Sequence, residues 1–421
     1  MTVPDGDDRL HLNDPRVAAA QRRTLWILAI SQIVGTVGVG VAPTIGILLA
    51  GEVTNSEAWA GIARTASTLG AALLGFPLGN LAAREGRRIA LSSGWFIAAI
   101  GAALLVAAAQ WQLVVPLFAG LLMIGAGSAV TLQARFAATD LATPANHAKS
   151  LSLIVWVGTI GMVLGPNLGA VGECLGQSIT LVPFAAAFAI AAVFLAAAGI
   201  VVLVFLRPDP LLLLQASELP EPKARRKSGS IRRVVDELTA NREARYAVVT
   251  ILCAQAVMVA VMTMTPVHIA HHEGPITIIG ITISLHIVGM FAFAPLVGMV
   301  TDRLGHRLAI AVGAGILLAS LIIAIIWPSS ITWVVISLFL LGLGWSFANV
   351  AGSALFSAVI SPEGRASSQG GVDALSNLAG ATAAFAAGPI LAATSFAWLS
   401  AIAVVLLIPI AWMTAMTERR A

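Results

Sequence analysis

The ten residues 79–88 read GNLAAREGRR, and the ten residues 298–307 read GMVTDRLGHR. The two stretches share glycines at their first and eighth positions and basic residues around the second glycine, and they lie 219 positions apart (298 − 79 = 219). Apolar runs of about 20 residues, the length that crosses the hydrocarbon core of a membrane, flank both stretches. They therefore predict two equivalent short loops, each between two membrane-spanning helices of a duplicated chain.

Further matches between the two halves keep the same order and nearly the same spacing. They are Gln32 with Gln255 (255 − 32 = 223), Gly125-Ala-Gly127 with Gly342-Leu-Gly344 (342 − 125 = 217), and Gly165-Pro166 with Gly388-Pro389 (388 − 165 = 223). The only long polar stretch lies between the two sets. We therefore expect an N-terminal segment 1–23, a six-helix bundle 24–206, a linker 207–243, a second six-helix bundle 244–416 and a tail 417–421.

The composition is that of a membrane protein. Of the 421 residues, 58% are hydrophobic and 10% are charged, and the mean hydropathy is +0.92, whereas a soluble domain carries roughly 25% charged residues. The apolar runs are continuous rather than alternating, which predicts helices and excludes a barrel. Twelve runs are long enough to span a membrane: 24–49, 58–79, 88–108, 112–138, 148–170, 179–206, 244–270, 276–299, 307–327, 331–355, 367–393 and 396–416.

Lys and Arg are distributed unevenly among the loops. When both termini are placed in the cytoplasm, all the Lys and Arg of the connecting loops fall on the cytoplasmic side. The opposite loops contain none and hold Glu52, Glu57, Glu173 and Glu273 instead. We expect no cleavable signal segment before the first span, because residues 1–21 are polar. We therefore expect a multi-pass protein of the cell membrane with both termini inside, whose positive charge orients the chain and does not indicate nucleic-acid binding.

Both loop stretches resemble the G-x-x-x-D-R-x-G-R-R signature of the major facilitator superfamily. Residues 161–169, GMVLGPNLG, resemble the G-x-x-x-G-P-x-x-G signature of its twelve-span drug:proton antiporters. The resemblance implies an all-α membrane fold of twelve helices in two pseudo-symmetric six-helix bundles. It also implies secondary transport by alternating access, with the substrate bound between the bundles.

The resemblance carries specific roles to matching positions. The gating-loop candidates are Gly79, Arg84, Gly86, Arg87, Arg88, Gly298, Asp302, Arg303, Gly305 and Arg307, and the antiporter-signature residues are Gly161, Gly165, Pro166 and Gly169. The first loop departs from the signature because its acidic position is Ala83. Glu85 or Asp140 are the candidates to supply the missing charge.

Ionisable residues within the predicted spans or near their ends are costly in lipid and are candidates for function. Asp373, His286 and Asp140 are the proton-coupling candidates. The alternatives are that Asp373 is a structural partner of Arg135 or of another arginine on the cytoplasmic side, and that His286 is a satisfied core histidine. The arginine that drug exporters of the family usually carry in the fourth span is Leu121 here, so proton coupling rests on the resemblance.

Polar and soft side chains on the helices that would line the cavity suit a hydrophobic or amphipathic ligand. The substrate-cavity candidates are Gln32, Arg64, Gln255, Met258, Trp345, Asn349 and Asn377. Packing or interhelical hydrogen bonding is the alternative for the uncharged residues, and pairing with Glu52 or Glu57 is the alternative for Arg64. The sequence indicates no metal site and no cofactor, since an exposed loop is favoured over a metal site for the histidines near Glu273.

These features favour a proton-coupled exporter of hydrophobic or amphipathic small molecules. The alternative is a translocator of a lipid or of a siderophore-like anionic amphiphile, anchored by Arg64; a nutrient importer is less favoured. A P-loop is absent, so ATP is not the expected energy source, and neither an enzyme nor a scaffold accounts for the loop signatures. We expect a small-molecule or lipid-like substrate, protons and membrane lipids as partners, no nucleic acid, and a monomer.

Overall fold

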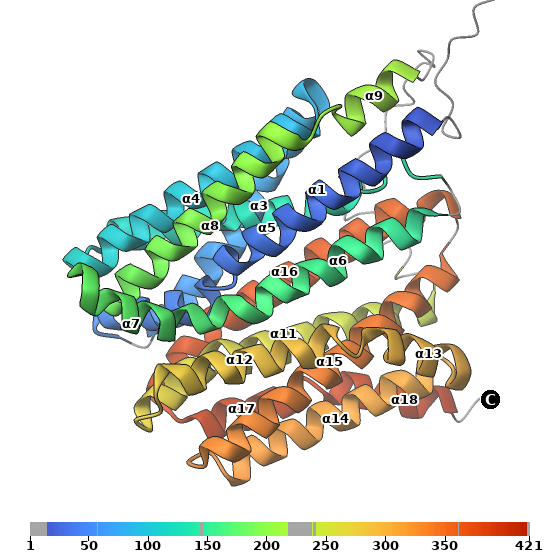
Figure 1. Cartoon of the computed structure of the whole chain (residues 1–421). Coiled ribbons are helices and arrows are strands. Elements are labelled where there is room, and N and C mark those ends of the chain that lie inside the picture. Colours follow the sequence, from blue (N-terminus) through green and yellow to red (C-terminus); the bar gives the residue numbers. More distant parts are fainter. Residues whose placement is uncertain are drawn as a thin grey trace, which may run out of the picture.

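The computed structural model describes residues 15–56, 58–143, 146–217, 238, 241–360 and 362–418. All regular structure in these residues is helical (Figure 1). The N half contains α1 (Pro15–Val39), the π-helical turn η1 (Ala42–Gly46), α2 (Ile47–Thr54), α3 (Ala58–Glu85), α4 (Arg87–Trp111), α5 (Val114–Ala137), α6 (His147–Leu164), the 3-10 turn η3 (Gly165–Asn167), α7 (Leu168–Ile179), α8 (Pro183–Phe205) and α9 (Pro210–Ser217). The C half contains α11 (Arg242–His271), α12 (Ile276–Phe291), α13 (Ala294–Leu304), α14 (His306–Ile326), α15 (Ile331–Val359), α16 (Pro362–Ala393), α17 (Phe396–Val405) and α18 (Ile408–Glu418).

These elements form twelve helical stretches that are long and apolar enough to cross a membrane, counted over the described residues. The number predicted from the sequence is therefore confirmed, and so is the all-α fold. The first stretch, Pro15–Thr54, starts nine residues before the predicted span (24 − 15 = 9). The helix continues because Val17 and Ala20 pack against Leu141 and so bury an apolar face beyond the expected span. The basic run in the predicted linker lies outside the described residues.

Each half has its own apolar core, and Figure 1 shows the blue-to-green helices on one side of the molecule and most of the yellow-to-red helices on the other. In the N half, Trp95 is fully buried, and its indole Nε1 donates to Ser31 Oγ at 3.0 Å. Gly35 and Gly127 pack directly on its ring. Small residues thus let α1 and α5 close on α4 around one large aromatic side chain.

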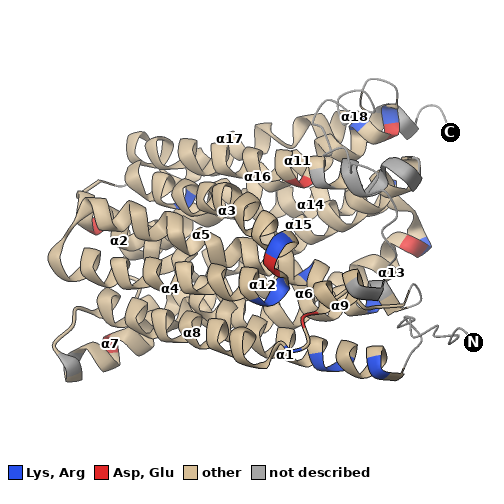
Figure 2. Cartoon of the chain, turned by 90° about the horizontal axis from the view of Figure 1, so that it is seen from above, with Lys and Arg blue, Asp and Glu red and all other residues tan. Residues whose placement is uncertain are grey.

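The two ends of the helix bundle differ in charge (Figure 2). We define the basic end by the loops that hold Arg87 and Arg307, and the acidic end by Glu52, Glu173 and Glu273. The separation follows the loop asymmetry in the sequence.

The internal repeat is visible in the backbone. Gly86 and Gly305 occupy equivalent positions of the two loop stretches and have φ angles of +89° and +85°. A side chain is strained in this region, so a glycine is required where each loop turns into the next helix. The repeat also holds inside the bundles, where Gln32 lies beside Gly158 and Gln255 lies beside Gly380.

Candidate functional site

The two halves meet near the acidic end through several helix pairs, and two of these contacts contain hydrogen bonds between the halves. In the first, α3 packs on α16, and the Thr65 hydroxyl donates to the carbonyl oxygen of Ala381 at 3.1 Å. Gly61 and Gly388 face the backbone of the opposite helix, where a Cβ would overlap it. The absence of side chains at these glycines lets the helices approach closely, so this part of the interface excludes bulky groups.

The second contact joins the antiporter-like signature to α12. Asn167 Nδ2 donates to Ser284 Oγ at 2.8 Å, and that hydroxyl donates to the carbonyl oxygen of Val163 at 2.6 Å. Gly169 faces the Ile276 side chain in the same region. Asn167 and Ser284 were not among the candidates from the sequence. Both are polar residues inside apolar runs, and this pattern could have indicated a contact between helices.

The same signature packs on α1 with its other face. Gly161 lies against Thr36 and the backbone of Ile33, and Gly165 lies against Gly40. The Thr36 hydroxyl donates to the carbonyl oxygen of Gly158 at 2.9 Å. Pro166 lies within η3, the 3-10 turn where α6 ends and α7 begins. The signature thus contacts α1 of its own half and α12 of the other half.

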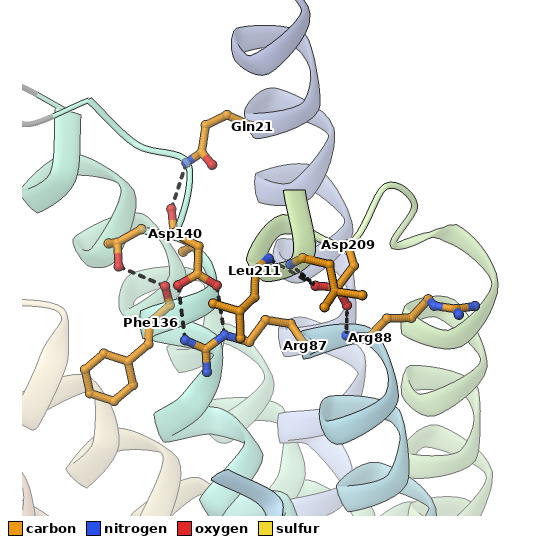
Figure 3. A network of polar contacts seen from close by, with 10 residues as sticks. Gln21, Arg87, Arg88, Phe136, Asp140, Asp209 and Leu211 are labelled. Carbon is orange, nitrogen blue, oxygen red and sulfur yellow. Dashed lines mark hydrogen bonds and ion pairs between the residues drawn. The ribbon is translucent and has the colours of Figure 1, made fainter. Parts of the chain in front are cut away.

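The first loop stretch is held by an aspartate that follows the sixth span (Figure 3). The Asp209 carboxylate accepts hydrogen bonds from the backbone N–H groups of Arg88 at 2.7 Å, Leu211 at 3.0 Å and Leu212 at 3.2 Å. It also lies against Gly86, where a Cβ would come within 2.5 Å of Oδ2. Asp209 was not among the candidates from the sequence, although an aspartate directly before a proline commonly marks the start of a helix.

Asp140 lies beside the same loop and outside the helices that span the membrane. Arg87 makes a bidentate ion pair with it, at 2.8 Å from Nε to Oδ2 and 3.1 Å from Nη2 to Oδ1. Figure 3 shows this pair next to the bond from Gln21 Nε2 to the Ala138 carbonyl oxygen, which is 2.7 Å long. Asp140 therefore supplies an acidic partner to the loop whose own acidic position is Ala83, while Glu85 is exposed.

The second loop stretch is arranged differently. Arg307 Nη2 donates to Glu243 Oε1 at 2.6 Å, and both residues line a cavity of about 550 Å³ at the basic end. Of the remaining gating candidates with side chains, Arg84, Asp302 and Arg303 are exposed and Arg88 is half-buried. Open space surrounds the positions that a Cβ would occupy at Gly79, Gly298 and Gly305.

One pair of opposite charges faces across the two halves. Arg135 near the end of α5 and Asp373 on α16 interact electrostatically, without an ion-pair contact within 4.0 Å. The Asp373 side chain is exposed, whereas Arg135 Nε is buried without a hydrogen-bond acceptor in the described residues. Asn377 donates to the Asp373 backbone carbonyl at 3.0 Å and so leaves its carboxylate unengaged.

His286 lies inside the C half. Its side chain is fully buried, and Nδ1 lies 2.7 Å from the carbonyl oxygen of Leu338 on α15. The backbone of Gly342 packs on the ring, and Nε2 has no partner in the described residues. His286 therefore lies in the core with one ring nitrogen engaged and the other unengaged, and its role in coupling stays a prediction.

The cavity candidates fall into two groups. Gln255 Oε1 accepts a hydrogen bond from Trp345 Nε1 at 2.8 Å, and the indole meets Phe291 edge-on at 5.8 Å between ring centroids. Met258 is buried beside them in the C-half core. Asn349 is half-buried and Asn377 is exposed.

In the N half, Gln32 is buried on α1, and its Oε1 has no partner in the described residues. Arg64 is half-buried on α3, and its Nε also has no acceptor there. Two candidates of this half therefore carry unsatisfied polar atoms.

The histidines near Glu273 form an aromatic contact at the acidic end. His268 is buried, its Nε2 lies 2.6 Å from the carbonyl oxygen of Pro328, and its ring stacks on Phe396 at 4.3 Å. His272 Nδ1 lies 3.0 Å from the His268 carbonyl oxygen. Over the residues that the structure describes, no three metal-ligating side chains converge.

Comparisons with known proteins agree with this architecture. The family model described as Major Facilitator Superfamily matches residues 25–274 and 246–420. Two proteins of Bacillus subtilis (strain 168), described as uncharacterized MFS-type transporters YddS and YdeG, are 37% and 38% identical. Each match covers 92% of this chain, with 90% of YddS and 91% of YdeG. A crystal structure of a mutant nucleoside transporter NupG superposes with a TM-score of 0.74 at 16% identity, over 94% of this chain and 99% of that one.

Proposed function

The chain belongs to the Major Facilitator Superfamily and is a secondary transporter, and we propose that it exports hydrophobic or amphipathic small molecules in exchange for protons. Membership of this superfamily supports a role in transport rather than in catalysis. Export is supported by the antiporter-like signature, whose kinked helix contacts both halves at the acidic end. The proposed location is the cell membrane, with the chain acting as a monomer.

The proposed orientation places the basic end in the cytoplasm. The described contacts between the halves then close the outer side, through Thr65 with Ala381 and Asn167 with Ser284. On the inner side, no side chain or helix packs against Gly79 or Gly298. The conformation is therefore proposed to be one that accepts its substrate from the cytoplasm or the inner leaflet.

Native cysteines provide a test of this orientation. Cys174 is exposed on α7 at the acidic end, and Cys253 is half-buried in α11. We expect a membrane-impermeant maleimide to label Cys174 in intact cells of a Cys253→Ser variant. An added cysteine at the exposed position Ala83, in a chain lacking both native cysteines, is expected to react only after the cells are permeabilised. The reverse pattern would contradict the orientation.

The single observation that carries proton coupling is the placement of Asp373 opposite Arg135 of the other half. In the proposed cycle, release of a proton from Asp373 to the cytoplasm leaves a carboxylate that attracts Arg135. This attraction draws α5 and α16 together and favours closure of the inner side. Protonation from the outside then removes the attraction and allows the inner side to reopen.

Proteoliposomes with an imposed pH gradient test this function. The purified protein is reconstituted, a panel of amphipathic compounds is added, and the internal pH is recorded. We expect at least one compound to cause a proton flux that protein-free liposomes lack. If no compound moves or causes proton flux while a labelled lipid crosses the bilayer, small-molecule export is rejected in favour of lipid translocation.

A further inference from the structure

Arg64 is a charged side chain placed on the protein-facing side of α3. Gly61 and Thr65 of this helix pack on α16, and Gly70 packs on α5. At about 100° per residue, Arg64 falls between these two contact faces. The exposed apolar side chains Leu69, Leu73 and Phe76 lie on the opposite side of the helix, which is the side that suits lipid.

Within the part of the chain that the structure describes, no hydrogen bond or ion pair engages the Arg64 guanidinium. Its Nε–H is buried and finds no hydrogen-bond acceptor in the described residues. The hydroxyls of Ser67 and Thr68 donate instead to the Arg64 backbone carbonyl, at 2.9 and 3.1 Å. The Thr65 hydroxyl donates to the carbonyls of Gly61 and Ala381. The nearby polar groups therefore satisfy one another and leave the side-chain charge uncompensated.

An unpaired charge in a membrane-spanning helix is costly, and such residues normally face a partner inside the protein. The face of α3 that carries Arg64 lies next to the apolar core of the C half. Ala60 is one turn before Arg64 and belongs to that core cluster. Arg64 is also within one turn of the Gly61 and Thr65 contacts that join the halves at the acidic end. A ligand at Arg64 would therefore lie against the closed part of the interface.

We propose that Arg64 binds the anionic oxygen group, a carboxylate or phosphate, of an amphipathic cargo molecule. The guanidinium fork matches two oxygens of such a group, and a bond between ionised partners is stronger than a neutral one. The anion supplies the charge that the protein lacks at this position, while the apolar part of the cargo lies along the neighbouring core surface. The inference rests on the proposed transport function and specifies its substrate class.

Binding of a matched probe pair tests the proposal without transport or a pH gradient, so its outcome is separable from that of proton-coupled export. The probes are 11-(dansylamino)undecanoic acid and its neutral methyl ester, titrated into full-length protein in phosphatidylcholine nanodiscs. Hydrogen bonds to charged groups predict a preference of about tenfold or more for the acid. Arg64→Gln is expected to abolish this preference while leaving ester binding unchanged, and Arg64→Lys to retain part of it. Arg23→Gln, which removes an exposed arginine of α1, is the charge-matched control and should behave as the unmodified protein does.

Thermal unfolding separates binding from a structural role. Because Arg64→Gln removes an uncompensated charge, it should unfold at or above the temperature of the unmodified protein. Equal affinity for acid and ester, or an unchanged acid preference in Arg64→Gln, would overturn the proposal. If Arg64→Gln does not fold, a preference in Arg64→Lys equal to that of the unmodified protein would also count against guanidinium recognition.

The source of the anionic group is resolved in nanodiscs that contain phosphatidylglycerol. One outcome is that phosphatidylglycerol displaces the acid probe from the unmodified protein without displacing the probe that still binds to Arg64→Gln. In that case the anionic group belongs to a lipid headgroup. If the acid binds equally in both kinds of nanodisc, the group belongs to a small amphipathic acid. Either result supports the anion site.

Discussion

Asp373→Asn is expected to abolish compound-driven proton flux in proteoliposomes. Asparagine keeps the size and hydrogen-bonding capacity of the side chain but cannot carry a proton. It also removes the charge that interacts with Arg135 across the two halves. Compound binding should persist, because the substitution changes no packing contact that joins the helices.

Asp140→Asn is the matched control for this experiment. Asp140 is also a carboxylate near the basic end, but it is bound to Arg87 of its own half. Its substitution is expected to lower thermal stability while proton flux per folded molecule persists. If Asp373→Asn keeps its proton flux, the assignment of Asp373 is wrong, and His286→Gln becomes the next variant to measure.

Gly161→Ala is expected to destabilise the protein and to impair transport, whereas Gly158→Ala, one turn earlier on α6, should do neither. A Cβ at Gly161 would overlap Thr36 Oγ1 and the Ile33 backbone of α1. At Gly158 the nearest atoms lie at 3.8 and 3.9 Å, which is an ordinary contact. Overpacking of this kind costs about 1–3 kcal/mol. The comparison is made by thermal unfolding and by proteoliposome transport.

The effect of Gly161→Ala on transport follows from the second face of the same helix. Pushing α6 away from α1 would displace Asn167, which holds α12 of the other half through Ser284. We therefore expect a leak across the acidic end in addition to lower stability. Equal behaviour of the two alanine variants would show that the close contact with α1 does not matter for closure.

The sequence predicts those features that depend on short stretches of chain. Span length, continuous apolar composition and loop charge give twelve helices, and all twelve are found in the described residues. The repeated loops at 79–88 and 298–307 predict equivalent turns, and Gly86 and Gly305 share the same left-handed backbone conformation. These are local properties, because hydropathy, glycine conformation and topogenic charge act over a few residues.

The tertiary structure alone decides which polar groups meet. Asp209 caps the loop at Gly86 from more than 120 residues away (209 − 86 = 123). The sequence places Arg135 and Asp373 in opposite halves, and only the packed structure brings the two charges close enough to interact. Spacing along the chain fixes how far a side chain lies from its helix end, but the rotation of each helix is set by packing against its neighbours. For that reason the number of spans could be predicted from the sequence, whereas the ion pairs, the buried position of His286 and the protein-facing position of Arg64 could not.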